Sequence, residues 1–237
     1  MTGTVKVDKR GVKLIAHRGL SGLYLENTLA AFEAAGKRSY YGIETDVHRT
    51  ADGKFILVHD DDLKRIAGVN RKVEKSTLAD LRTVKLKDEK NGLDAYLPTP
   101  NEYFAVCKKY GKQAIFELKN PLPKSALSEL IGEVRKTGWF ARTTFISFSK
   151  KNLLYLREIA PDADAQFLSE RCKKKEIKFM VENRLDADLH LDCVTEEGVS
   201  ALHKAGLKVN VWTVDEPKRM QELVSYGVDF VTTNILE

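Results

Sequence analysis

Three acidic residues occupy alternating positions in two predicted β-strands. Glu44 and Asp46 are two residues apart, so in a strand their side chains point to the same face, roughly 7 Å apart. Glu117 lies in a later predicted strand. Mg²⁺, Ca²⁺ and Mn²⁺ prefer oxygen ligands such as carboxylates, and neither predicted strand contains a cysteine. The cluster predicts a divalent-cation site; the alternative is a salt-bridge network with Arg18 and Lys119.

Two histidines follow strands close to these acids. His17 and His59 could serve as a base and an acid, because imidazole titrates near neutral pH. A histidine at a strand end is often structural, and His48 is interpreted in that way because a turn follows it.

Basic and aromatic side chains complete the candidate site. The guanidinium of Arg18 could hold a phosphate through two hydrogen bonds, and Lys119 could add a point charge. Trp212 and, more weakly, Phe148 could cover the carbon part of a substrate, or could pack at a rim.

Strand-like runs alternate with amphipathic stretches along the chain. Eight such strands favour a single (β/α)8 TIM barrel of the α/β class over a doubly wound sheet. The runs are 14–17, 42–48, 113–119, 143–148, 165–168, 187–191, 208–213 and 228–232. A further strand, 54–59, is expected to form a hairpin with 42–48, and Asn27 is expected to cap the first helix, 28–37. In a barrel, the active site lies at the carboxyl ends of the strands.

One irregular stretch, at about 60–100, interrupts this alternation. It contains a short helical pattern, 78–84, and a charged segment, 85–94, which is expected to be a loop. It is interpreted as an insertion over the barrel mouth, within a single domain that spans 1–237.

Composition limits the possible classes of protein. The 237 residues include 43% hydrophobic and 31% charged residues, which excludes a disordered or fibrous chain. No apolar run is long enough to span a membrane, and the polar first residues do not resemble a secretory signal. Three widely spaced cysteines fit a reducing compartment, so a cytoplasmic location is expected. The net charge of +5, without a basic stripe, suits a small anionic substrate better than nucleic acid.

The motifs in their order along the chain resemble the glycerophosphodiester phosphodiesterase family. The most specific segments are 15–19 (IAHRG), 26–28 (ENT), 44–47 (ETDV) and 58–60 (VHD). The resemblance continues through 63–65 (LKR), 97–100 (LPTP), 116–119 (FELK), 147–148 (SF) and 211–215 (VWTVD). It therefore extends over nearly the whole chain.

The resemblance implies a TIM barrel and a divalent-metal phosphoric diester hydrolase of lipid and glycerol metabolism. The products implied are sn-glycerol 3-phosphate and an alcohol. The residues implied are catalytic His17 and His59, metal-binding Glu44, Asp46 and Glu117, and substrate-binding Arg18, Lys119, Trp212 and Phe148. A cyclic phosphate intermediate is expected, with direct attack by metal-bound water as the alternative, and the sequence does not assign which histidine is the base and which is the acid. A phospholipase C- or D-like enzyme on the same fold and a non-catalytic binding module are the alternatives. No membrane anchor is expected, and the oligomeric state is left open.

Overall fold

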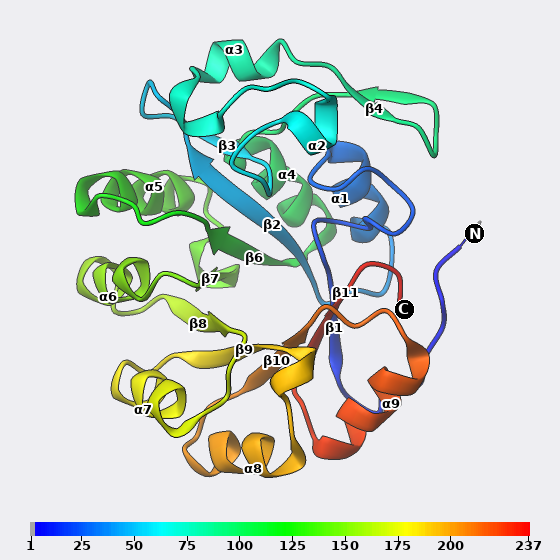
Figure 1. Ribbon diagram of the computed structural model, residues 1–237, viewed down its shortest axis with the longest axis vertical. Coiled ribbons are helices and arrows are strands. Elements are labelled where there is room, and N and C mark those ends of the chain that lie inside the picture. Colours follow the sequence, from blue (N-terminus) through cyan, green and yellow to red (C-terminus); the bar gives the residue numbers. More distant parts are fainter. Residues whose placement is uncertain (1–2) are drawn as a thin grey trace.

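A computed structural model describes residues 3–237 as a closed barrel of eight parallel strands. The barrel strands lie side by side in the order of the chain (Figure 1). Strand β1 pairs with both β2 and β11, which closes the ring. The barrel strands are β1 (Lys13–Ala16), β2 (Gly42–Arg49), β6 (Gln113–Leu118), β7 (Thr143–Ser147), β8 (Asp164–Ser169), β9 (Asp186–His190), β10 (Val209–Trp212) and β11 (Phe230–Thr233). The (β/α)8 prediction is confirmed.

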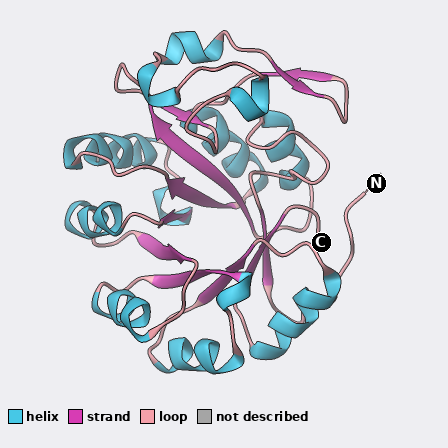
Figure 2. Ribbon diagram, in the orientation of Figure 1, coloured by secondary structure: helices cyan, strands magenta, loops and turns pink. Residues whose placement is uncertain are grey.

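Helices surround the strands on the outside, as Figure 2 shows. The apolar faces of these helices bury against the outward side chains of the strands, in the main core of the molecule. The barrel helices are α1 (Leu29–Gly36), α4 (Pro100–Tyr110), α5 (Lys124–Lys136), α6 (Lys150–Ile159), α7 (Lys174–Glu182), α8 (Glu196–Lys204) and α9 (Pro217–Tyr226). Short 3₁₀ turns occupy Val73–Lys75, Phe140–Arg142 and Leu191–Cys193.

The predicted hairpin and insertion lie above one side of the barrel. Strand β3 (Phe55–Leu57) pairs antiparallel with β2, as expected. The insertion then contributes α2 (Lys64–Ala67), α3 (Leu78–Arg82), β4 (Leu86–Asp88) and β5 (Leu93–Ala95). It has a small apolar core of its own, formed with β3 and centred on Leu63, Val73 and Leu86.

The expectation of a charged loop at 85–94 is wrong, because β4 and β5 form an antiparallel hairpin there. Lys87 lies opposite Asp94, so two opposite charges face one another across the strands. Leu86 is fully buried at one end of the hairpin. The many charged residues of this segment indicated a loop, and strands of three residues are too short to give a clear alternating pattern.

The barrel interior has an apolar layer beneath a polar one. Ile15, Ile115, Ile146, Leu168 and Phe230 pack together inside the barrel. Because side chains alternate along a strand, Glu117 faces the same interior two residues beyond Ile115. The apolar layer therefore closes the interior below a set of charged side chains near the carboxyl ends of the strands.

Candidate active site at the carboxyl end of the barrel

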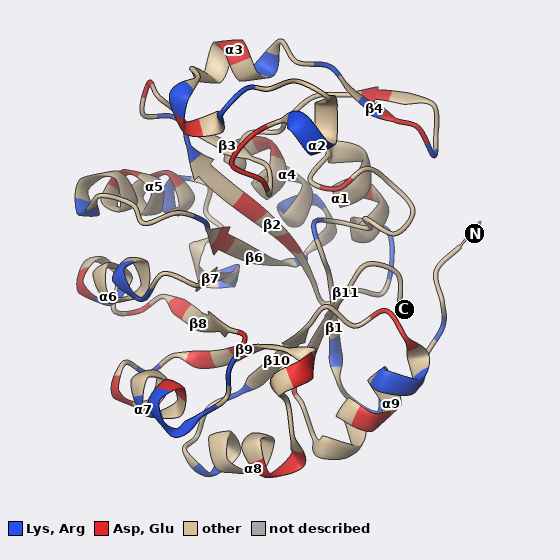
Figure 3. Cartoon of the chain, viewed as in Figure 1, with Lys and Arg blue, Asp and Glu red and all other residues tan. Residues whose placement is uncertain are grey.

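The register of β2 and β6 brings the three predicted carboxylates together. Asp46 pairs directly with Glu117 across these parallel strands, and Glu44 precedes Asp46 by two residues on the same face. One oxygen from each of the three residues can be chosen so that all lie within 4.8 Å of one another. Figure 3 shows acidic segments side by side on the two strands. All three side chains are buried.

Two cations contact this acidic cluster. The Nζ of Lys119 lies 3.0 Å from Glu117 Oε1 and 3.5 Å from Asp46 Oδ1. The Nε of Arg18 lies 3.5 Å from Asp46 Oδ2, and its backbone N–H donates to Glu44 Oε2 at 2.8 Å. The salt-bridge interpretation therefore describes part of the arrangement.

These cations do not neutralise all three acids. Burial, Asp46 and Glu117 raise the pKa of Glu44 well above its ordinary value. Burial and Asp46 likewise raise the pKa of Glu117 to about 7. Burial alone would raise the pKa of Asp46, but Lys119 and Arg18 lower it below its ordinary value. Crowded carboxylates repel one another, and a bound cation would relieve that repulsion.

The donor set fits a hard divalent cation. Asp46 Oδ1 is buried and accepts no hydrogen bond, with only the Lys119 ammonium near it at 3.5 Å, so this carboxylate oxygen is available as a ligand. The three residues supply only oxygen, and the mutual distances suit a common ion. Net charge favours the same conclusion, because three acids face two cations, one of which also pairs with Glu26.

Both predicted histidines use the same ring nitrogen, Nδ1, for a hydrogen bond. The Nδ1 atom of His17 is 2.8 Å from Asn234 Oδ1, and that of His59 is 2.7 Å from Asp60 Oδ1. Because these oxygens accept hydrogen bonds, each Nδ1 carries the proton and Nε2 is left free. The Nε2 of His17 lies 4.0 Å from Glu44 Oε2. Burial and the neighbouring Arg18 lower the pKa of His17 to about 4.

The predicted aromatic side chains line the cavity at this end of the barrel. Phe148 and Trp212 meet edge to face, with ring centroids 5.6 Å apart. His190 also meets Trp212 edge to face, with ring centroids 5.0 Å apart. The cavity that they enclose is also lined by His17, Arg18, Glu44, His59 and Glu117. All nine predicted site residues thus lie in or directly beside one cavity.

His48 has the structural position that was expected. It is buried, and its Nε2 lies 3.2 Å from the backbone oxygen of His59. It therefore supports the segment that carries His59.

The role expected for Asn27 is wrong. Thr28 caps α1, because its hydroxyl accepts from the N–H of Ala31. Asn27 instead has a left-handed backbone (φ 52°), and its buried amide donates to Asp46 Oδ2 at 2.8 Å. Arg18 has a similar φ of 53°. Such strained non-glycine residues persist where surrounding contacts fix them, often at functional sites.

Sequence reasoning missed a fourth buried acid in this cavity. Asp188 of β9 lines it, and burial together with Glu117 raises the pKa of Asp188 well above its ordinary value. Asn210 donates to Asp188 Oδ1 at 2.7 Å. The signal was the alternation of Asp186, Asp188 and His190 in a predicted strand, which places all three on one face.

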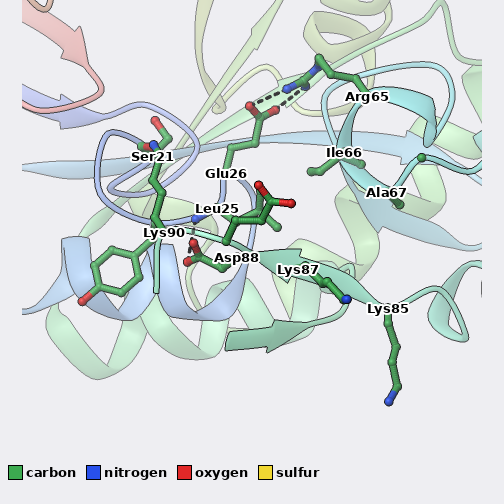
Figure 4. A pocket seen from close by; sticks show the side chains of 13 residues that line it. Ser21, Leu25, Glu26, Arg65, Ile66, Ala67, Lys85, Lys87, Asp88 and Lys90 are labelled. Carbon is green, nitrogen blue, oxygen red and sulfur yellow. Dashed lines mark hydrogen bonds and ion pairs between the residues drawn. The ribbon is translucent and has the colours of Figure 1, made fainter. Parts of the chain in front are cut away.

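A second cavity, of about 610 Å³, lies next to the first. Glu26 and Arg65 line it, joined by the dashed lines in Figure 4, while Lys85 and Lys87 extend from the segment of β4. Glu26 also contacts Arg18 of the first cavity, at 2.9 Å. This side chain is therefore part of the wall between the two cavities.

These features define a TIM-barrel enzyme whose carboxylates, imidazoles and cations meet at the carboxyl ends of the strands. The chain belongs to the Glycerophosphoryl diester phosphodiesterase family, whose sequence model matches residues 17–237. It is a phosphoric diester hydrolase. Among residues 3–237, no helix is both long and apolar enough to cross a membrane.

Named relatives match over most of their length. A glycerophosphodiester phosphodiesterase of Bacillus subtilis (strain 168) is 29% identical, over 93% of this chain and 82% of the relative. One from Caldanaerobacter subterraneus subsp. tengcongensis is 28% identical, over 93% of each chain.

Solved structures show the same fold. A glycerophosphodiester phosphodiesterase from Parabacteroides distasonis has a TM-score of 0.79 at 27% identity and covers 94% of this chain and 93% of its own. A phosphodiesterase from Oleispira antarctica, in complex with its product sn-glycerol-3-phosphate, has a TM-score of 0.83 at 24% identity and covers 94% and 92%.

Proposed function

We propose that the chain hydrolyses glycerophosphodiesters to sn-glycerol 3-phosphate and an alcohol. The observation that carries this proposal is the meeting of two imidazoles, with free Nε2 atoms, beside a carboxylate cluster and two cations. A phosphodiester needs charge neutralisation, an activated nucleophile and a proton for its leaving group. Each requirement has a candidate residue in this cavity.

The metal ligands proposed are Glu44, Asp46 and Glu117. Mg²⁺, Ca²⁺ and Mn²⁺ all fit an oxygen-only donor set. When bound, such an ion supplies positive charge for the phosphate and makes a coordinated hydroxyl more acidic.

The phosphate would lie between Arg18 and Lys119. The guanidinium can donate two hydrogen bonds to two phosphate oxygens, and the ammonium adds a point charge. Both side chains are mostly buried, at 17% and 15% exposed, so that their charges are only partly screened.

The surroundings of the histidines favour His17 as the general base and His59 as the general acid. The Nδ1 of His17 faces a neutral amide, and burial with Arg18 lowers its pKa to about 4, so it is neutral near pH 7. The Nδ1 of His59 instead faces a carboxylate, Asp60 Oδ1, at 2.7 Å.

The proposed nucleophile is the 2-hydroxyl of the substrate's own glycerol. His17 would accept its proton as the oxygen bonds to phosphorus, and His59 would protonate the departing alkoxide. This gives a cyclic phosphate that joins O2 and O3 of sn-glycerol, and water then cleaves its bond from phosphorus to O2 with the two histidines in exchanged roles. An intramolecular nucleophile has a large advantage in effective concentration.

Phe148 and Trp212 are proposed to contact the glycerol carbons. Their edge-to-face pair forms an apolar part of the wall of the cavity that the charged residues also line. Such a wall binds the carbon backbone while the polar groups fix its orientation.

The experiment is a panel of glycerophosphodiesters incubated with the metal-stripped protein, to which Mg²⁺, Ca²⁺ or Mn²⁺ is added back separately. Release of glycerol 3-phosphate is the expected result. His17→Ala and His59→Ala are expected to lower kcat by about 100-fold or more. His203→Ala is the matched control, because this histidine lies on α8 and pairs with Asp229. Absence of release with every metal would contradict the proposal.

A further inference from the structure

One arginine of the insertion connects two carboxylates near the site. The guanidinium of Arg65, on α2, donates from Nη2 and Nη1 to the two oxygens of Glu26, at 2.6 and 3.0 Å. Its Nε donates to Asp60 Oδ2 at 2.6 Å. All three nitrogens of the fork are thus engaged, in a geometry that fixes both acids.

Each carboxylate holds a different residue of the active site. Glu26 Oε1 accepts from Arg18 Nη1 at 2.9 Å, on the side that would bind phosphate. Asp60 Oδ1 lies 2.7 Å from the Nδ1 of His59, on the side that would protonate the leaving group. Two otherwise separate groups are therefore connected through a single side chain.

The two acids remain charged in this arrangement. Although burial opposes it, Arg65 and Arg18 lower the pKa of Glu26. Although burial opposes it, Arg65 and His59 lower the pKa of Asp60. Two carboxylates and three basic side chains therefore form a continuous chain of contacts, whose middle member is Arg65.

We propose that Arg65 is a positioning residue, which sets the orientation of His59 through Asp60 and that of Arg18 through Glu26. The insertion would thereby align the acid and the phosphate-binding cation with respect to each other. This inference rests on the proposed function, because it assigns Arg65 no effect except through His59 and Arg18.

A purely structural role for Arg65 predicts something different. Its side chain is 52% exposed, so that its ion pairs are screened and add little to global stability. Helix α2 has four residues, and none of them is buried. Removing the guanidinium should therefore disturb two contacts at the active site far more than the fold.

The first test compares Arg65→Ala with Lys64→Ala, the adjacent exposed residue of the same helix. Arg65→Ala is expected to lower kcat/KM by about 10- to 100-fold, with a lower kcat and a higher KM, because small misplacements are costly. Lys64→Ala should match the wild type, and both should melt within a few degrees of it. Arg65→Lys should recover only part of the loss, because an ammonium cannot hold both carboxylates.

Double variants separate the two branches. With Asp60→Asn, Arg65→Ala should cost little further kcat, because the contact to His59 is already weakened. In the Glu26→Gln background, adding Arg65→Ala should raise KM little further, because the contact to Arg18 is already weakened. Losses that simply multiply in both backgrounds would overturn the proposal, because they would show that Arg65 acts independently of its partners.

Direct contact with the leaving alcohol is the remaining competitor, because Arg65 lines the second cavity. Positioning predicts the same fold-loss for glycerophosphocholine, glycerophosphoethanolamine and glycerophosphoglycerol, whereas a loss confined to one head group would contradict it. A readout without turnover is the affinity for glycerol 3-phosphate, which Arg65→Ala should weaken several-fold. If the wild type binds glycerol 3-phosphate but hydrolyses no diester, the proposed function fails; unchanged affinity and kcat in Arg65→Ala contradict positioning alone.

Discussion

The Nδ1 atom of His17 lies 2.8 Å from Oδ1 of Asn234, whose own amide donates to Asp215 Oδ2 at 2.6 Å. Asp215 also accepts from the backbone N–H of Asn234, at 2.8 Å. The hydrogen-bond partner of His17 is therefore a neutral amide oxygen, and the Asp215 carboxylate holds that amide in place. His59 contacts its carboxylate directly, and this difference separates the proposed base from the proposed acid.

Exchanging the amide and the carboxylate tests that difference. The double variant Asn234→Asp/Asp215→Asn keeps a donor–acceptor pair between the two positions but puts a negative charge against His17. An opposite charge favours the protonated imidazole and raises its pKa. The proposed base then loses its proton only at higher pH, so the acid limb of the kcat/KM profile should move up by about one pH unit or more. The limb would stay in place if His17 were not the base.

Removing a carboxylate ligand should weaken metal binding selectively. Glu44→Gln, Asp46→Asn and Glu117→Gln are each expected to lower metal affinity by about 10-fold or more, since each removes a charged oxygen donor. Excess EDTA should abolish activity in the wild type. Glu129→Gln, at an exposed position of α5, is the control and should bind metal as the wild type does. Full activity in EDTA would contradict a metal-dependent site.

Metal affinity should also depend on pH in a defined direction. Burial and Asp46 raise the pKa of metal-free Glu117 to about 7, so this carboxyl binds a proton below that pH. A ligand must lose its proton to bind a cation. The apparent Kd for Ca²⁺ or Mn²⁺ should therefore increase up to tenfold per unit as pH falls below about 7, measured by calorimetry at pH 8, 7 and 6. A Kd that is constant across this range would contradict the raised pKa.

The sequence was sufficient for the barrel because its strands have a strong pattern. Ile43 and Val47 pack in the outer core, while Glu44 and Asp46, which alternate with them, face inward. A period of two in a buried strand determines the face of each side chain. The predicted acids, histidines and cations therefore met at one end of the barrel.

The contacts that orient these residues could not be predicted in this way. Asn27 and Thr28 both suit a helix cap, and the choice depends on a backbone conformation stabilised by the contact with Asp46. The partner of His17, Asn234, is 217 residues away in the chain, so no local pattern relates them. Arg65 likewise reaches Glu26 across 39 residues, from a four-residue helix without periodicity.

The last prediction concerns the two ends of the substrate. The proposed site residues would contact the phosphate, the metal and the glycerol side, whereas the alcohol would extend toward solvent or into the cavity of about 610 Å³ beside Arg65. That cavity is wide and lined by both acids and lysines, so choline, ethanolamine and glycerol head groups should be accepted with modest differences in kcat/KM.

Changes on the glycerol side should matter far more than changes of head group. An analogue of glycerophosphocholine without the 2-hydroxyl lacks the proposed intramolecular nucleophile, and its turnover should collapse because the effective concentration of that group is lost. The measurement is choline release from both compounds at equal metal concentration, with binding of the analogue checked by competition. Equal turnover would exclude the cyclic phosphate and leave water as the nucleophile. A strong preference for one head group would instead show that the insertion forms a selective pocket.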